Sequence, residues 1–203
     1  MSGAVGPLDG VTAIVLAGGR SSRFGADKLA ARMDGRALLD YAVSAVAEIA
    51  PAIIVAVGRD AEPVIPPALA TRTVLVHDPV PFGGPLVGLV AALDACATPL
   101  ALVIAGDMPR LVPAVLRRLA AAVGNDVAAA TLEVPDRIQP LPMAIDVAAA
   151  RRSGTRVLDR GGRSLRDFLV DLGAVSIPAA AWRALDPEGS TLVDVDEPGD
   201  LDR

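Results

Sequence analysis

One short run of the sequence sets the class of fold: Val11-Thr12-Ala13-Ile14-Val15-Leu16-Ala17, followed at once by Gly18-Gly19. An unbroken apolar run of this length, β-branched at its start, is typical of a strand buried on both faces of a sheet. Similar runs predict further strands at residues 53–57, 73–76, 100–105, 126–131, 174–177 and 191–195. Helices are predicted among them at residues 37–50, 86–97, 113–123, 165–172 and 198–201. This alternation predicts an α/β protein, with a three-layer α/β/α arrangement around an open, mostly parallel sheet.

The stretch from Gln139 to Ile145 is apolar but contains Pro140 and Pro142. Proline cannot donate a backbone hydrogen bond to a neighbouring strand, so this stretch is predicted to be an edge strand or a loop. Residues 1–10 are rich in glycine and are predicted to form a flexible N-terminal tail, followed by one domain at 11–203.

Composition excludes several classes of protein. A hydrophobic content of 52% over 203 residues excludes a disordered chain, and the single cysteine, Cys96, excludes a disulfide scaffold. The formal net charge of -5 argues against nucleic acid as a partner, because such binding needs a basic surface. No apolar run is long enough to cross a bilayer, and the N-terminus lacks the features of a signal peptide. We therefore expect a cytoplasmic protein with no membrane partner, and we favour a monomer.

A loop rich in glycine and positive charge follows the first strand: Gly18-Gly19-Arg20-Ser21-Ser22-Arg23-Phe24-Gly25-Ala26-Asp27-Lys28. Ligands of open α/β sheets bind beyond the carboxyl ends of the strands, which is where this loop starts. Glycines let backbone N–H groups approach phosphate oxygens, and cations in an otherwise acidic chain favour a polyphosphate ligand. The loop lacks the G-x-G-x-x-G pattern of dinucleotide-binding proteins, and no hydroxyl residue follows Lys28, as the P-loop requires. The sequence therefore predicts a phosphate-binding loop of another kind.

Two aspartates follow predicted strands at the same edge of the sheet. Asp107 comes directly after the strand at 100–105, where its carboxylate would point into the crevice beside the loop. Mg²⁺ prefers one or two protein carboxylates together with phosphate oxygens and water, so Asp107 is a candidate metal ligand. From the residues alone, capping the following helix is an equally good role for Asp107. Asp78 follows the strand at 73–76, again at a carboxyl end, and on its own would serve as a turn residue before Pro79.

The loop resembles the signature of nucleotidyltransferases of the molybdenum cofactor guanylyltransferase type, in the pattern Leu-Ala-Gly-Gly-x-Ser-x-Arg-x-Gly-x-Asp-Lys at residues 16–28. Further segments resemble that family in the same order: Gly84-Pro85-Leu86-Val87-Gly88, Gly106-Asp107-Met108-Pro109, Gln139-Pro140-Leu141, Gly162-Arg163-Ser164-Leu165 and residues 193–201. The resemblance covers nearly the whole chain and implies a Rossmann-like nucleotidyltransferase domain at 11–203.

The resemblance also implies an activity: Mg²⁺-dependent transfer of GMP from GTP to a molybdopterin-type acceptor, with release of pyrophosphate. It implies that Asp107 holds the Mg²⁺, and that Arg23 and Lys28 stabilise the α-phosphate and the leaving pyrophosphate. The residues implied to bind the nucleotide lie on the strand ends and the loop: Leu16, Ala17, Gly18, Gly19, Lys28, Asp78 and Asp107.

Two features depart from the family. Asp194 and Asp196 stand where the guanylyltransferases typically carry asparagines, and they look more like the cytidylyltransferase relatives. Ala56 stands where the family often has an asparagine that touches the nucleotide. Two other enzymes therefore stay open: a CTP-dependent molybdopterin cytidylyltransferase and a sugar-1-phosphate nucleotidyltransferase. The alternative outside enzymes is a catalytically silent NTP-binding or chaperone-like relative.

Three arginines, Arg160, Arg163 and Arg166, lie close together near the start of the predicted helix at 165–172. They are candidates to hold a second, phosphorylated substrate. A solvated helix start is the simpler interpretation, and the sequence favours it slightly.

Overall fold

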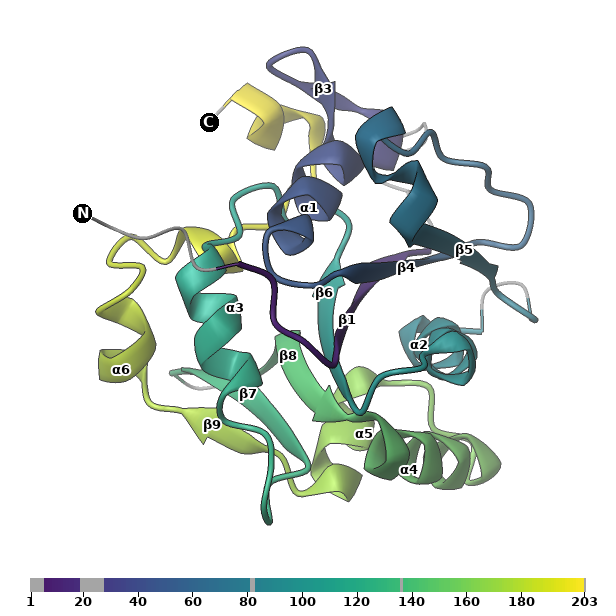
Figure 1. Ribbon diagram of the computed structural model, residues 1–203, viewed down its shortest axis with the longest axis vertical. Coiled ribbons are helices and arrows are strands. Elements are labelled where there is room, and N and C mark those ends of the chain that lie inside the picture. The colour runs from purple at the N-terminus through teal and green to yellow at the C-terminus, as the bar shows by residue number, and fades with distance from the viewer. Residues whose placement is uncertain (1–5, 19–27, 81–82, 136, 203) are drawn as a thin grey trace.

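The strand Val11–Ala17 (β1) lies in the interior of the sheet and pairs in parallel with a strand on either side (Figure 1). The structure, a computed structural model, describes residues 6–18, 28–80, 83–135 and 137–202. These residues form a seven-stranded sheet in the order β5-β4-β1-β6-β8-β7-β9. The strands beside β1 have the bounds β4 (Ala52–Val57), β5 (Thr73–His77), β6 (Leu100–Ala105), β7 (Ala129–Val134), β8 (Arg137–Asp146) and β9 (Val175–Ile177). Only β8 runs antiparallel to its neighbours among these strands, so the mostly parallel sheet is confirmed.

Helices cover both faces of the sheet, which confirms the three-layer arrangement (Figure 1). One face carries α1 (Leu38–Ala47) and α3 (Pro113–Ala120), and the other carries α2 (Pro85–Ala95), α4 (Val147–Asp159) and α5 (Leu165–Leu172). Side chains of β1 alternate between the two cores: Val15 is buried in the first and Ile14 in the second. This two-sided burial explains why the strand is apolar along its whole length. No helix in the described ranges is long and apolar enough to span a bilayer.

The stretch from Gln139 to Ile145 is an interior strand, so its prediction as an edge strand or loop was wrong. It belongs to β8, which pairs with β6 on one side and β7 on the other. Pairing with β6 begins only at Met143, and the register with β7 shifts between Ala130 and Leu132. The two prolines therefore lie where the ladder is already interrupted, and they cost few hydrogen bonds.

The helices predicted from the sequence include none at residues 147–159, where the structure has α4 with Gly154 in its middle. Glycine inside a helix is unfavourable and is usually taken as a break. Here a Cβ at position 154 would lie 2.6 Å from a methyl group of Val90 on α2. The two helices pack so closely at this point that only glycine fits. The contacting residue, Val90, is distant from Gly154 in the sequence.

Residues 191–195 do not form the predicted last strand. They form a 3-10 turn, Ser190–Leu192, and an extended segment that runs past the end of β6. The buried carboxylate of Asp186 accepts hydrogen bonds from the backbone N–H groups of Ser190 and Thr191. The N–H of Val195 then donates to the carbonyl of Asp107 (3.0 Å). The bonds to the Asp186 side chain and to the Asp107 carbonyl thus take the place of hydrogen bonds to a neighbouring strand. The short helix predicted at 198–201 is present as the 3-10 turn Pro198–Asp202.

Two small elements were also missed. A hairpin of β2 (Arg32–Met33) and β3 (Arg36–Ala37) turns at Asp34-Gly35, where both residues have positive φ. Asp-Gly is a strong hairpin signal, so this turn was readable from the sequence. The short helix α6 (Ala179–Arg183) buries Trp182 in the core on the side of α1 and α3.

The chain enters β1 through residues 6–10, which contact the domain. The N–H of Leu8 donates to the carbonyl of Ile49 (2.6 Å), and Arg117 donates to the carbonyl of Gly6. Residues 1–5 lie outside the described residues, and the division of the chain at residue 10 stays a prediction.

Candidate active site

The carboxyl ends of β1, β4, β5 and β6 lie at one edge of the sheet, because these strands are parallel. The chain builds β4 and β5 on one side of β1 and then crosses to β6 on the other side. In open α/β sheets the crevice at such a reversal of strand order is where ligands bind. Gly18, Asp78 and Asp107 all follow strand ends at this edge. The fold thus brings these predicted site residues to one place.

Lys28 links two carboxylates that are distant in sequence. Its Nζ lies 2.8 Å from Oδ2 of Asp107 and 2.9 Å from Oδ1 of Asp196. The Lys28 side chain is only 13% exposed, whereas that of Asp196 is 56% exposed. Burial lowers the pKa of Lys28, but the two carboxylates outweigh this effect and raise the pKa overall. The ammonium is therefore held in its charged form between the two acids.

Asp107 lies in the turn that follows β6, and α3 begins later, with Val112 at its N-cap. The role of Asp107 as cap of that helix, open from the sequence, is therefore wrong. Its carboxylate instead faces the crevice and contacts Lys28.

The extended C-terminal segment brings a second acidic group to the crevice. Asp194 remains solvent-exposed, yet desolvation by the groups around it raises its pKa, and the charges of Asp196 and Asp107 raise it further. Asp194 and Asp196 lie on this extended segment and not on a strand. Of the pair, Asp196 is the one that contacts Lys28, and the sequence left its role open.

Asp78 lies between two glycines on different elements. A Cβ at Gly18 would stand 3.2 Å from one carboxylate oxygen of Asp78, and a Cβ at Gly88 on α2 would stand 2.7 Å from the other. Burial raises the pKa of Asp78. The close approach shows that Gly88 is required by Asp78, a relation that the sequence alone does not reveal.

The remaining predicted residues fall into two groups. Leu16 and Ala17 form the half-buried end of β1, and the carbonyl of Leu16 already accepts the N–H of Gly106 (2.9 Å). Gly19 and Arg23 lie outside the described residues, so their roles stay predictions.

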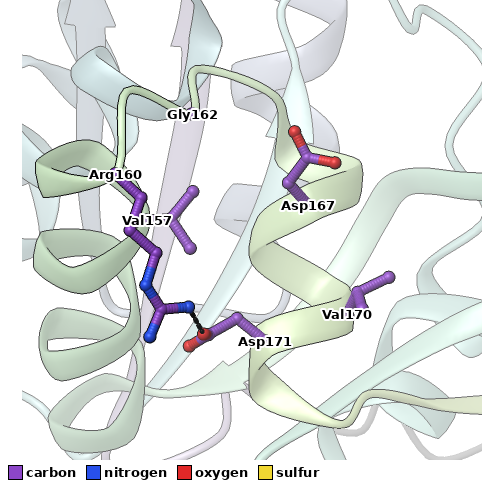
Figure 2. A pocket seen from close by; sticks show the side chains of 6 residues that line it. All are labelled: Val157, Arg160, Gly162, Asp167, Val170 and Asp171. Atoms are coloured by element: carbon purple, nitrogen blue, oxygen red, sulfur yellow. Dashed lines mark hydrogen bonds and ion pairs between the residues drawn. The ribbon is translucent and has the colours of Figure 1, made fainter.

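The three arginines proposed for a second substrate have separate surroundings. Arg160 contacts Asp171 (3.3 Å) across a cavity of about 350 Å³ between α4 and α5, which Figure 2 shows from close by. Hydrogen bonds from Ser153 and Arg156 lower the pKa of Asp171, so this carboxylate stays charged. Arg163 donates to the carbonyls of Leu158 and Gly162. The structure thus holds Arg160 and Arg163 within the α4–α5 region, and Arg166 is exposed in the first turn of α5.

The donor set around Lys28 suits a hard divalent cation. Two carboxylate oxygens, one from Asp107 and one from Asp196, lie 2.8 and 2.9 Å from the same atom, Nζ of Lys28. Among the described residues, no cluster of three or more His, Cys, Asp or Glu could hold a metal. Mg²⁺ needs only one or two protein carboxylates when phosphates and water complete its shell. The residues present therefore fit a metal that arrives with a nucleotide.

Comparison with known proteins identifies the family. The model of the MobA-like NTP transferase domain matches residues 13–175. The chain belongs to this family. A probable molybdenum cofactor guanylyltransferase from Chloroflexus aggregans is 36% identical over 196 residues, which cover 94% of this chain and 91% of that protein.

Solved structures agree with this assignment. The molybdopterin-guanine dinucleotide biosynthesis protein A from Archaeoglobus fulgidus has a TM-score of 0.72 and 25% identity, covering 95% of each chain. The 2-C-methyl-D-erythritol 4-phosphate cytidylyltransferase from Thermus thermophilus shares the fold, with a TM-score of 0.66, 20% identity and coverage of 93% of this chain and 94% of that chain. The match to the MobA-like family includes Lys28, Asp78 and Asp107 but ends before Asp196.

Proposed function

We propose that this protein transfers GMP from GTP to a molybdopterin-type acceptor and releases pyrophosphate. One observation carries the proposal: Lys28 and Asp107, a cation and a carboxylate of the matched family region, meet at the ligand-binding edge of the sheet, 2.8 Å apart. The Chloroflexus relative, which matches over most of both chains, is named a probable molybdenum cofactor guanylyltransferase. Both findings support the reading of the loop at residues 16–28 as a nucleotide-binding loop.

The residues of the site have distinct roles in this proposal. Asp107, assisted by Asp196, would hold Mg²⁺, which when bound neutralises phosphate charge during transfer. Lys28 stabilises charge on the α-phosphate and the leaving pyrophosphate, and Arg23 is proposed to do the same. The turn at Gly18 and the carboxylate of Asp78 hold the nucleoside. Transfer then needs in-line positioning of the acceptor phosphate, and no covalent help from the protein.

A CTP-dependent cytidylyltransferase is the second candidate, and Asp194 and Asp196 are the observation that favours it. The start of the loop, Ala17-Gly18-Gly19, favours GTP instead, because in the family that the loop resembles an Ala-Gly-Gly start tends to accompany GTP and an Ala-Ala-Gly start CTP. A silent NTP-binding relative is less well supported, because Lys28 and Asp107 are both present and in contact. A cytoplasmic location and a monomeric state stay predictions.

Pyrophosphate release tests the proposal. The full chain is supplied with GTP, CTP, UTP or ATP and Mg²⁺, with and without molybdopterin, and release that needs both GTP and molybdopterin is the expected result. Release with CTP in place of GTP would establish the cytidylyltransferase alternative, and no release with any NTP would contradict enzymatic transfer.

Asp107→Asn tests the metal role within the same assay. Asparagine keeps the shape but loses the charge, so release should fall about a hundredfold or more. Asp126→Asn, which changes an exposed aspartate outside the crevice, is the matched control and should keep full activity. Full activity in Asp107→Asn would contradict its role as metal ligand.

A further inference from the structure

Lys28 occupies the position toward which two carboxylates converge. Its ammonium contacts Oδ2 of Asp107 at 2.8 Å and Oδ1 of Asp196 at 2.9 Å, and little of its side chain is exposed. Both distances fall in the short range that is typical of charge-assisted hydrogen bonds. The same ammonium is proposed above to bind phosphate, and the same Asp107 oxygen belongs to the proposed metal ligand. The arrangement therefore places two proposed functions of the site in competition.

A divalent cation on Asp107 would share its carboxylate with the Lys28 ammonium. Like charges at such short distance repel strongly where water is partly excluded. Metal and ammonium can both stay only if a further negative charge separates or neutralises them. The phosphates of a nucleotide carry that charge, and they also offer Lys28 another partner.

The carboxylate pair is held in place by bonds that do not involve Lys28. The backbone N–H of Val195 donates to the carbonyl of Asp107, which ties the C-terminal segment to the turn after β6. The N–H groups of Asp196 and Glu197 both donate to Oδ2 of Asp200, and Val195 is buried. Removal of the ammonium should therefore leave two acids facing each other.

We propose that Lys28 is a built-in counter-ion that keeps metal off Asp107 and Asp196 until the phosphates of the nucleotide draw its ammonium away. Asp196, which assists Asp107 in the proposed function, then also holds Lys28 beside Asp107 before the nucleotide binds. Metal and nucleotide enter this site together, and metal alone binds weakly. The inference rests on the proposed function, because it assumes that phosphate and metal meet at Lys28 and Asp107.

Binding of Mn²⁺ to the full chain without nucleotide tests the inference, followed by calorimetry or by the electron paramagnetic resonance signal of free Mn²⁺. Lys28→Met removes the ammonium, and we expect it to bind Mn²⁺ about tenfold more tightly than the wild type, or more. Arg110→Met is the matched control, since it removes one positive charge from an exposed residue on the loop that carries Asp107. It should bind Mn²⁺ like the wild type. Equal Mn²⁺ affinity in Lys28→Met and the wild type, or an equal gain in both variants, would overturn the proposal.

Three further measurements separate the charge effect from changes in folding. Lys28→Gln provides a second neutral side chain of similar length, and circular dichroism establishes that each variant is folded. Lys28→Met combined with Asp107→Asn should lose the gain in Mn²⁺ affinity, and a gain that persists would contradict the role of Asp107. The Mn²⁺ binding experiment uses no nucleotide and no acceptor. Its result therefore does not depend on whether the pyrophosphate assay supports GTP as the substrate.

Discussion

Asp78 is enclosed by two glycines that are seventy residues apart in sequence. Gly18 directly follows β1 and Gly88 lies on α2, and a Cβ on either would press on a carboxylate oxygen of Asp78. A half-buried carboxyl group is kept in this place although burial opposes its ionisation. At the scale of single residues, Asp78 therefore places a carboxylate at the edge of the crevice at a cost in stability.

The pH dependence of the protein's stability should show this cost. The folded protein binds a proton at Asp78 more tightly than the unfolded chain, because burial raises the pKa. Stability from this group is present at acidic pH and is lost as pH rises from the ordinary aspartate pKa of about 4 through the raised value. Asp78→Asn should therefore raise the Tm at pH 7 while weakening GTP binding. Differential scanning calorimetry at pH 5 and 7 measures the effect, with exposed Asp60→Asn as control.

A lower Tm of Asp78→Asn than of the wild type at pH 7 would show that a partner stabilises the charge of Asp78. That result would contradict the expectation that burial makes the ionised carboxylate destabilising.

Gly18→Ala should shift the choice of nucleotide. Its methyl group would stand 3.2 Å from a carboxylate oxygen of Asp78, so it narrows the space at the end of β1 and displaces that oxygen. The larger purine should suffer more than the pyrimidine, by about 1–3 kcal/mol, the usual value of one methyl group in a binding pocket. Calorimetric titration with Mg²⁺ plus GTP or CTP measures the shift. Tighter binding of CTP than GTP by the wild type would overturn the guanylyl assignment and keep the family.

At the scale of elements, α2 and α4 hold each other through more than apolar packing. The last turn of α2 has no basic residue, and Arg151 from α4 supplies one. It donates to the carbonyls of Leu93 and Cys96 at 2.6–3.0 Å. A cation at the C-terminus of a helix also interacts favourably with the helix dipole. This cap fixes the helix whose N-terminal half carries Gly88 beside Asp78.

Arg151→Met should lower the free energy of unfolding by about 1–3 kcal/mol, because the carbonyls at the end of α2 lose their donor. Urea unfolding followed by circular dichroism gives the value. Arg152→Met, on the same helix but exposed, is the matched control and should change stability little. Equal losses in the two variants would mean that the effect comes from helix propensity or net charge, not from the cap.

At the scale of the whole molecule, the C-terminal segment returns to the first strands and completes the site. The hydroxyl of the buried Thr191 accepts the N–H of Val112 (3.1 Å), and the N–H of Val195 then bonds to Asp107. Val195 packs with Met33 and Leu38, next to the segment that contains Lys28. The site thus depends on contacts between the beginning, the middle and the end of the chain.

Thr191→Val should loosen this closure. Valine has the shape of threonine but accepts no hydrogen bond, so the N–H of Val112 loses its acceptor at a cost of about 1–3 kcal/mol. We expect a lower Tm and faster hydrogen exchange at residues 191–196. Ser190→Ala is the control, because the bond of Ser190 to Asp186 uses its backbone N–H. Unchanged exchange in Thr191→Val would show that the segment is held elsewhere.

The amino-acid pattern by itself determined the layered α/β fold, the bounds of β1 and β6, and the place of Asp107 and Asp78 at strand ends. Those features follow from local periodicity and from the rule that parallel strands end at one edge. The assignment of α4, the interior position of β8 and the course of residues 191–195 needed the tertiary structure. Each depends on a partner remote in sequence: Val90 for Gly154, β6 for the stretch after Pro142, and Asp186 with Asp107 for the C-terminal segment.

The same division applies to the site. The sequence marked Lys28 as a cation for phosphate, because its loop follows a buried strand. Only the fold placed its ammonium between Asp107 and Asp196, since these residues lie 79 and 168 positions further along the chain. Short-range patterns encode which element a residue occupies, whereas the distance between two side chains is decided by how the elements pack.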